Sequence, residues 1–152
     1  MRTHFCLLSA LLLSAASVAQ QTITELEPLS FGLLAITDNS SVSSVTVLPS
    51  NTSASSNSIY VVKQGRAAEL LFEGYGARIQ VTISDNVNNQ PLSNLHNNQR
   101  FYLNRLIYNP TLVTDSYGSA VLTVGGQIST SGDGSSYNDG YYDATVSLTV
   151  DF

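Results

Sequence analysis

The chain has 152 residues, a single cysteine and a formal net charge of −5 at pH 7, with six Lys and Arg against eleven Asp and Glu. This length fits one domain of ordinary size, which would bury about two thirds of its unfolded surface. An acidic chain with few lysines is a poor partner for nucleic acids and for anionic membrane surfaces, so we exclude both function classes.

The first 19 residues have the build of a secretory signal peptide. Arg2 supplies a basic start, an apolar run follows, and small residues lead to a cleavage site after Ala19. The apolar run is too short to span a bilayer. We therefore expect residues 1–19 to be removed, and residues 20–152 to form one exported domain in the periplasm, at the cell surface or outside the cell, with no transmembrane segment. Cys6 leaves with the signal, so the domain has no disulfide.

The remaining chain shows no helical pattern but a succession of short apolar runs separated by Asn, Ser, Gly and Asp. Alternation of apolar and polar residues indicates strands with one dry face and one wet face. In chain order, the expected strands cover residues 29–33, 44–47, 59–62, 68–72, 79–84, 101–108, 119–128 and 141–152. Short strands at such intervals, joined by polar turns, predict an all-β sandwich or barrel.

The alternation is most regular in the last expected strand, residues 141–152. One face carries Tyr142, Ala144, Val146, Leu148, Val150 and Phe152. At about 3.4 Å per residue the strand would be about 40 Å long. We expect its dry face to lie against the protein's own opposing sheet, or against a subunit that takes that place. The predicted dry layer consists of Leu29, Phe31, Val81, Val124, Val146, Leu148 and Phe152.

Two long polar segments, residues 85–100 and 129–140, are expected to be loops. The first is rich in side-chain amides, and the second contains Tyr137 and leads to Tyr141 and Tyr142. Amides and aromatic rings can bind a sugar through hydrogen bonds and ring stacking, and loops often carry function on β-scaffolds. A carbohydrate-binding module is therefore one alternative function.

Two arrangements of residues could be catalytic, but the sequence favours neither. His96 is the one histidine after the leader, but it lies among asparagines and no Gly-x-Ser-x-Gly elbow accompanies it. Glu69 and Glu73 could form a glycosidase pair, yet both lie on the outward face of one expected strand, which a solvated surface explains better.

A metal site is also not predicted. Asp133, Asp139 and Asp143 could contribute oxygens to a calcium ion, but their spacing does not match an EF-hand loop. We therefore predict no catalytic, metal-binding or cofactor-binding residue, and no enzyme activity.

Three motifs resemble those of a known family in their order and spacing. Leu29-Ser30-Phe31-Gly32 opens the fold, Val124-Gly125-Gly126 lies in the penultimate strand, and a regular strand runs from Gly140 to Phe152. This order resembles the bacterial domain-of-unknown-function 4402 family of exported immunoglobulin-like β-domains. It is similar, more loosely, to spore-coat-U-type and other chaperone–usher pilins. The resemblance implies an immunoglobulin-like antiparallel sandwich of about seven to eight strands.

The pilin resemblance implies a role for the last strand. A periplasmic chaperone, or a related or identical subunit, would bind it by strand addition. The chain departs from the pilin pattern in two ways. Pilins carry an N-terminal donor strand, whereas here Ile23 and Leu26 fall on opposite faces, beside Glu25 and Glu27. Many pilins also have a disulfide. The domain could therefore instead be a sandwich completed by its own first strand.

The sequence thus predicts an exported, non-catalytic structural or surface protein, pilin-like or adhesive. A small outer-membrane β-barrel is a further alternative, because a terminal Phe after alternating apolar residues is typical of the last strand of such barrels. Membrane strands, however, need about nine to eleven residues, and several of the expected runs are shorter.

Overall fold

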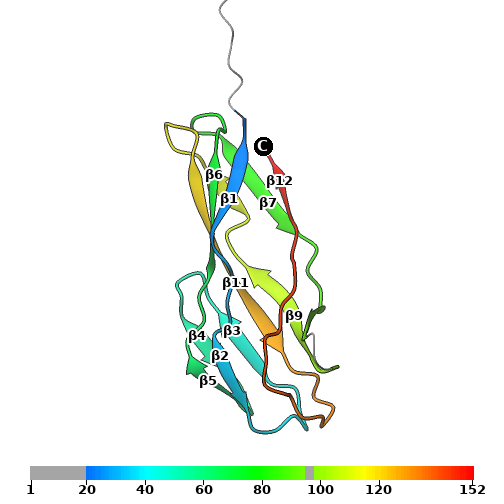
Figure 1. The fold of residues 1–152 in the computed structure, drawn as a ribbon. Coiled ribbons are helices and arrows are strands. Elements are labelled where there is room, and N and C mark those ends of the chain that lie inside the picture. The colour runs from blue at the N-terminus through cyan, green and yellow to red at the C-terminus, as the bar shows by residue number, and fades with distance from the viewer. Residues whose placement is uncertain (1–19, 95–97) are drawn as a thin grey trace, which may run out of the picture.

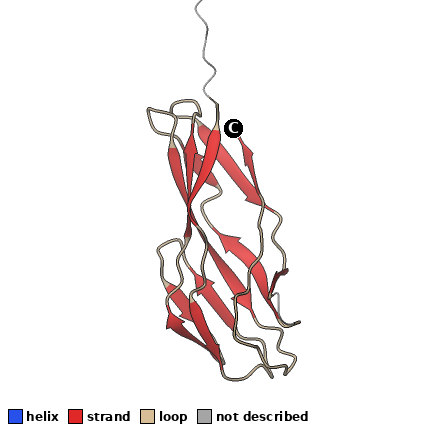
Figure 2. Cartoon of the chain, in the orientation of Figure 1, coloured by secondary structure: helices blue, strands red, loops and turns tan. Residues whose placement is uncertain are grey.

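The computed structural model describes residues 20–94 and 98–152, and these form twelve β-strands and no helix (Figure 1, Figure 2). The strands are β1 (Thr22–Glu27), β2 (Leu33–Ile36), β3 (Ser44–Val47), β4 (Ser53–Ser55), β5 (Ile59–Lys63), β6 (Ala68–Glu73), β7 (Gln80–Asp85), β8 (Gln90–Ser93), β9 (Arg100–Ile107), β10 (Thr111–Val113), β11 (Ala120–Ser129) and β12 (Leu148–Asp151). Their pairings are antiparallel, which confirms the predicted all-β, sandwich-like fold. The described residues contain no membrane-spanning helix.

The largest sheet has seven strands and is organised around β11. The first half of β11 pairs with β6, which pairs with β1 at the edge. In the second half, Gly126 pairs with Val47 of β3 and with Leu106 of β9. A strand residue with two partners has a neighbour on each side, so β3 and β9 flank β11. The sheet continues from β3 to β4 and from β9 to β8.

Two smaller sheets complete the fold. One has the strand order β10-β7-β12, so β12 is an edge strand that pairs only with β7. The other consists of β2 and β5. The C-terminus lies near the start of β1 at one end of the elongated molecule (Figure 1).

The core consists of two clusters of apolar side chains. The first joins β6 and β11 to β7, and its buried members are Ala68, Phe72, Tyr75, Val81, Ile83, Leu122 and Val124. The second joins β3, β5, β8, β9 and β11, and its buried members are Val45, Ile59, Leu92, Phe101, Leu103 and Ile128. Complete burial of one such side chain stabilises the fold by about 1.5–3 kcal/mol.

The predicted dry layer is buried to different degrees. Val81 and Val124 are buried, whereas Leu29, Phe31, Val146 and Leu148 are partly buried and pack against the clusters, as does Val150. Phe152 requires a correction, because 65% of it is exposed. Its ring packs edge-to-face against the buried Tyr75 of the first cluster, with the two ring centroids 5.1 Å apart.

Gly125 and Gly126 mark the place where β11 passes from one partner to the next. A side chain on Gly125 would meet the backbone oxygen of Val47. A Cβ on Gly126 would lie 3.1 Å from a methyl carbon of Leu29 and 3.2 Å from the ring of Phe31. Gly125 therefore needs to lack a side chain so that the neighbouring backbone can approach, and Gly126 lets the side chains of Leu29 and Phe31 pack closely on β11.

Three expectations about strands were wrong in extent. The described residues form twelve strands instead of seven to eight, because β1, β4, β8 and β10 lie outside the expected runs, where a neighbouring backbone pairs with a segment of three to six residues. The last strand covers only Leu148–Asp151, preceded by a single bridge between Asp143 and Ser93. The segment 85–100, expected to be a loop, contains strand β8.

Two predicted features cannot be placed in the fold. The leader with its cleavage site after Ala19 lies outside the described residues. The same holds for His96, which belongs to the undescribed residues 95–97.

Candidate functional site

An open apolar groove of about 1030 Å³ runs between two segments that are far apart in the sequence. One side, here called the N-terminal wall, consists of residues 28–36 together with Glu25. The other side, the C-terminal wall, consists of residues 137–146 together with Leu148. Figure 1 shows both segments along the length of the molecule, the first in blue and the second in red.

The base of the groove is part of the core. Its side chains come from β6, β8, β9 and β11 and are Ala68, Leu70, Leu92, Phe101, Leu103, Leu106, Val124 and Ile128. Most of them are buried members of the two clusters. The half-buried Leu29, Phe31, Val146 and Leu148 line the groove from the walls. Both core clusters are therefore open to this groove.

Each wall is held by backbone hydrogen bonds at a few points. In the N-terminal wall, the Ser30 N–H donates to the Arg66 carbonyl at 2.9 Å, and the Arg66 N–H donates back at 2.7 Å. In the C-terminal wall, Ser93 and Asp143 exchange two bonds of 3.0 and 3.2 Å. Residues 144–147 belong to no strand ladder of the described chain, and β12 has one free edge. The Thr145 carbonyl accepts a hydrogen bond from Gln90 Nε2 at 2.6 Å, and the rest of this stretch lies outside any ladder, so the C-terminal wall offers backbone groups to a further strand.

The glycines predicted as family motifs fix the course of both walls. Gly32 has a φ of +82°, and a side chain there would collide with the Lys63 carbonyl oxygen. Gly140 has a φ of +153°, and a side chain there would collide with the Asn94 side chain. Only glycine adopts such backbone angles readily and fits such close contacts. These two residues thus position the walls and do not themselves bind.

An aromatic cluster closes one end of the groove. The rings of Phe101 and Tyr137 lie 4.6 Å apart, and those of Phe101 and Tyr142 lie 5.0 Å apart in an edge-to-face arrangement. The Tyr137 hydroxyl donates to the Arg100 carbonyl at 2.7 Å and accepts the Ser131 N–H at 3.0 Å. Burial raises the pKa of Tyr137. Tyr137 and Tyr142, two of the three tyrosines of the sugar-binding alternative, are thus half-buried against the second core cluster, while Tyr141 is 96% exposed.

The loop before the C-terminal wall is tied down by a buried asparagine. The side-chain amide of Asn39 donates to Ser131 Oγ and Asp133 Oδ1 at 3.0 Å each, and to the Ser135 carbonyl at 2.9 Å. Its oxygen accepts the Gly132 N–H at 3.0 Å. Hydrogen bonds from Ser135 and then Ser131 lower the pKa of Asp133 to about 2. Residues 129–140 are therefore not a free binding loop along their whole length.

The structure does not assemble the acidic groups considered as metal or catalytic sites. Asp139 and Asp143 line the groove, whereas Asp133 is bound to the Asn39 network. Among the described residues, no three His, Cys, Asp or Glu side chains come close enough to hold a metal ion. Glu69 and Glu73 lie on β6 and do not line the groove.

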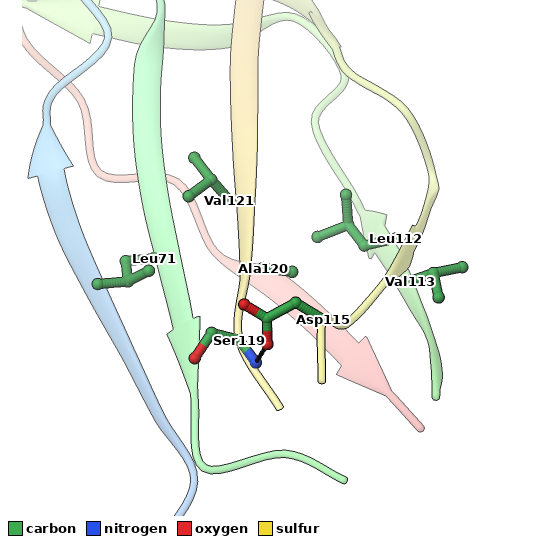
Figure 3. Close-up of a pocket in the computed structure, with 7 residues that line it drawn as sticks. All are labelled: Leu71, Leu112, Val113, Asp115, Ser119, Ala120 and Val121. Carbon is green, nitrogen blue, oxygen red and sulfur yellow. Dashed lines mark hydrogen bonds between the residues drawn. The ribbon is translucent and has the colours of Figure 1, made fainter. Parts of the chain in front are cut away.

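A second, shallower hollow lies on the outer face near β6, β10 and β11 (Figure 3). Its lining is mostly aliphatic and includes Leu71, Val113 and Val121. The Asp115 carboxylate accepts the N–H groups of Tyr117 at 2.8 Å and Ser119 at 2.9 Å, which closes the turn before β11. Asp115, the one carboxylate in the lining of this hollow, thus has a structural role, and the hollow lacks a reactive group.

The sequence predicted part of the groove and missed the rest. The terminal segment, including Gly140, Val146 and Leu148, was predicted to be a surface for strand addition, and it forms one wall. Leu29, Phe31 and Gly32 of the opposite wall were predicted as motif and core residues, but not as one side of an open groove. The part of the base on β8 and β9 was not predicted as part of a site. Apolar alternation does not distinguish a closed core from an open one.

No curated protein and no solved structure matches the chain. One family model does, and it covers residues 21–152, which include every strand of the fold and both walls of the groove. The chain therefore belongs to the family described as Domain of unknown function (DUF4402).

Proposed function

We propose that this protein is an exported, non-catalytic structural subunit of the cell surface, pilin-like in its design, whose groove is completed by a β-strand from another protein. The observation that carries this proposal is the open apolar groove between residues 28–36 and 137–148. The signal-like residues 1–19 support export.

The groove has the properties that strand addition requires. An inserted strand would lie beside the free edge of β12 and beside residues 144–147, which belong to no strand ladder of the described chain. Its side chains would alternate, so every second one would point toward Leu103, Leu106 and Val124 at the base. Each side chain buried there would contribute about 1.5–3 kcal/mol, and each backbone hydrogen bond about 0.5–1.5 kcal/mol.

Peptide binding to the exported form, residues 20–152, tests this function. A synthetic peptide with alternating apolar residues should form a one-to-one complex by native mass spectrometry and raise the melting temperature. A peptide of the same composition, scrambled so that the alternation is lost, is the control. The proposal fails if the domain is folded by circular dichroism yet binds neither peptide, or binds both equally.

A groove variant and a matched surface variant localise the binding. Val146→Asp places a charge in the C-terminal wall and should abolish binding of the alternating peptide. Val113→Asp makes the same change at a 66% exposed position of β10, outside the groove, and should leave binding unchanged. Equal loss in both variants would place the peptide elsewhere.

A further inference from the structure

The charged side chains that line the groove all have the same sign. Glu25 lies on the N-terminal wall, and Asp139 and Asp143 lie on the C-terminal wall. All three are exposed. The described lining contains no Lys, Arg or His. The groove is therefore apolar at its base and acidic along its walls.

These carboxylates have no cation beside them in the described part of the chain. The ion pair found there joins Arg66 to Glu27 at 3.2 Å, outside the groove lining. The two hydrogen bonds between Ser93 and Asp143 hold the backbone of Asp143 in place. Next to Asp139, the Asn138 carbonyl accepts a hydrogen bond from the Tyr142 hydroxyl at 3.0 Å, which holds the chain there. The two aspartates therefore hold defined places on the C-terminal wall.

We infer that the strand that fills this groove comes from a different protein and alternates apolar residues with lysine or arginine. This inference rests on the proposed function. The apolar residues would face the base, and the basic residues on the other side of the strand would lie near Glu25, Asp139 and Asp143. Pairing opposite charges favours the correct partner, and juxtaposing like charges disfavours the wrong one.

The same charges disfavour a second copy of this chain as the source of the strand. The first strand carries Glu25 and Glu27, and the terminal segment carries Asp143 and Asp151. Either segment would bring carboxylates against the acidic walls. The alternating segments of this chain therefore suit the groove less well than a basic strand does.

Three synthetic peptides test the inference. They share one alternating apolar pattern, and their other positions carry Lys, Gln or Glu. At low ionic strength, the Lys peptide should bind residues 20–152 about tenfold more tightly than the Glu peptide, since exposed charge pairs contribute modestly but add together. High salt should remove most of this difference. A Lys peptide without apolar alternation should not bind, which controls for general attraction to an acidic protein.

Charge variants of the protein show which carboxylates produce the preference for the Lys peptide. The double variant Asp139→Asn, Asp143→Asn should bind the Lys and Gln peptides with nearly equal affinity. The control variant Glu69→Gln, Glu73→Gln removes two charges outside the groove and should keep the preference. If both double variants still bind the Lys peptide more tightly than the Gln peptide, the acidic walls do not select the partner and the inference is wrong.

The possible outcomes separate this inference from the proposed function. Equal binding of all three alternating peptides would overturn the inference and leave strand binding intact. Preference for the Glu peptide would also overturn it and would point to a second copy as the partner. Failure of all three peptides with a folded domain would overturn the proposed function, and with it the inference.

Discussion

At the residue scale, Gly32 combines an unusual backbone angle with a close contact, and a matched glycine separates the two effects. Gly32 and Gly134 have φ angles of +82° and +81°. A side chain on Gly32 would collide with the Lys63 carbonyl, whereas a side chain on Gly134 would meet nothing within 4 Å. The left-handed conformation itself costs a non-glycine residue about 1–2 kcal/mol.

Gly32→Ala should therefore destabilise the fold more than Gly134→Ala. We expect a loss of about 1 kcal/mol in the free energy of unfolding for Gly134→Ala, and about 3 kcal/mol or more for Gly32→Ala. Urea denaturation of both variants measures the difference. Equal losses would mean that the N-terminal wall moves to accommodate the new methyl group.

Tyr108 predicts a pH dependence of stability at the alkaline end. Its hydroxyl donates to Asp85 Oδ2 at 2.6 Å. Burial, followed by the hydrogen bond and the negative charge of Asp85, raises the pKa of Tyr108 from 10.0 to about 12. Because the folded pKa is above the unfolded one, this stabilisation is complete below pH 10 and is lost as the pH rises toward 12.

The measurement is the free energy of unfolding between neutral pH and about pH 12. It should fall less steeply above pH 10 in Tyr108→Phe than in the parent chain. Some of the decline should persist, because burial also raises the pKa of Tyr75 and Tyr137. Identical slopes would show that Tyr108 titrates equally in both states.

At the scale of elements, β12 depends on its inner face for attachment. Leu148 is half-buried, packs against the first core cluster and pairs with Asp85 in the β7 ladder. Leu148→Asp would place a charge without a partner against that cluster, at a cost of about 2–4 kcal/mol. Thr149→Asp, on the exposed face of the same strand, should cost less than about 0.5 kcal/mol.

Thermal and urea unfolding of both β12 variants give this comparison. Unchanged stability in Leu148→Asp would mean that β12 contributes little to the isolated domain. Equal destabilisation by Thr149→Asp would instead mean that both faces of β12 are covered.

Local patterns predicted the strands that cover the core, missed the short strands β1, β4, β8 and β10, and did not predict where ladders begin and end. The alternation of residues 79–84 and 119–128 identified β7 and β11, because both are paired along their lengths and face the core on one side. The regular pattern of residues 141–152 was predicted as one strand, yet only Leu148–Asp151 has a neighbour. Alternating apolar residues predict that one face of a segment is buried. A β-ladder also needs the backbone of a second strand within hydrogen-bond distance.

The groove itself depends on distant contacts, and this explains why the motifs predicted residues of both walls but not that the two walls face each other across a groove. Gly140 and Val146 lie in or next to a segment whose regular alternation predicts a strand with one apolar face. The wall at residues 28–36 is short, and it becomes a wall only because Ser30 pairs with Arg66 and β2 pairs with β5. Such pairings, across tens of residues, leave no local signal in one sequence.

At the scale of the whole molecule, the open groove makes the unpartnered protein prone to associate. Apolar surface beside a free strand edge is a site for pairing with other chains. The exported form alone should therefore bind an apolar fluorescent dye. Because its acidic walls repel the acidic segments of a second copy, it should associate weakly in sedimentation experiments, at high protein concentration and more at high salt. An alternating peptide that fills the groove should suppress both signals.

Variants with one added charge show whether the groove is the source of this association. Val146→Asp, in the C-terminal wall, should reduce dye binding and association, because a carboxylate there disfavours apolar contacts. Val113→Asp, on the outer face, should leave both unchanged, although its side chain is the more exposed of the two. If Val113→Asp alone reduced association, the contact surface would be the hollow between β10 and β11, and the groove would already be closed to solvent in the isolated domain.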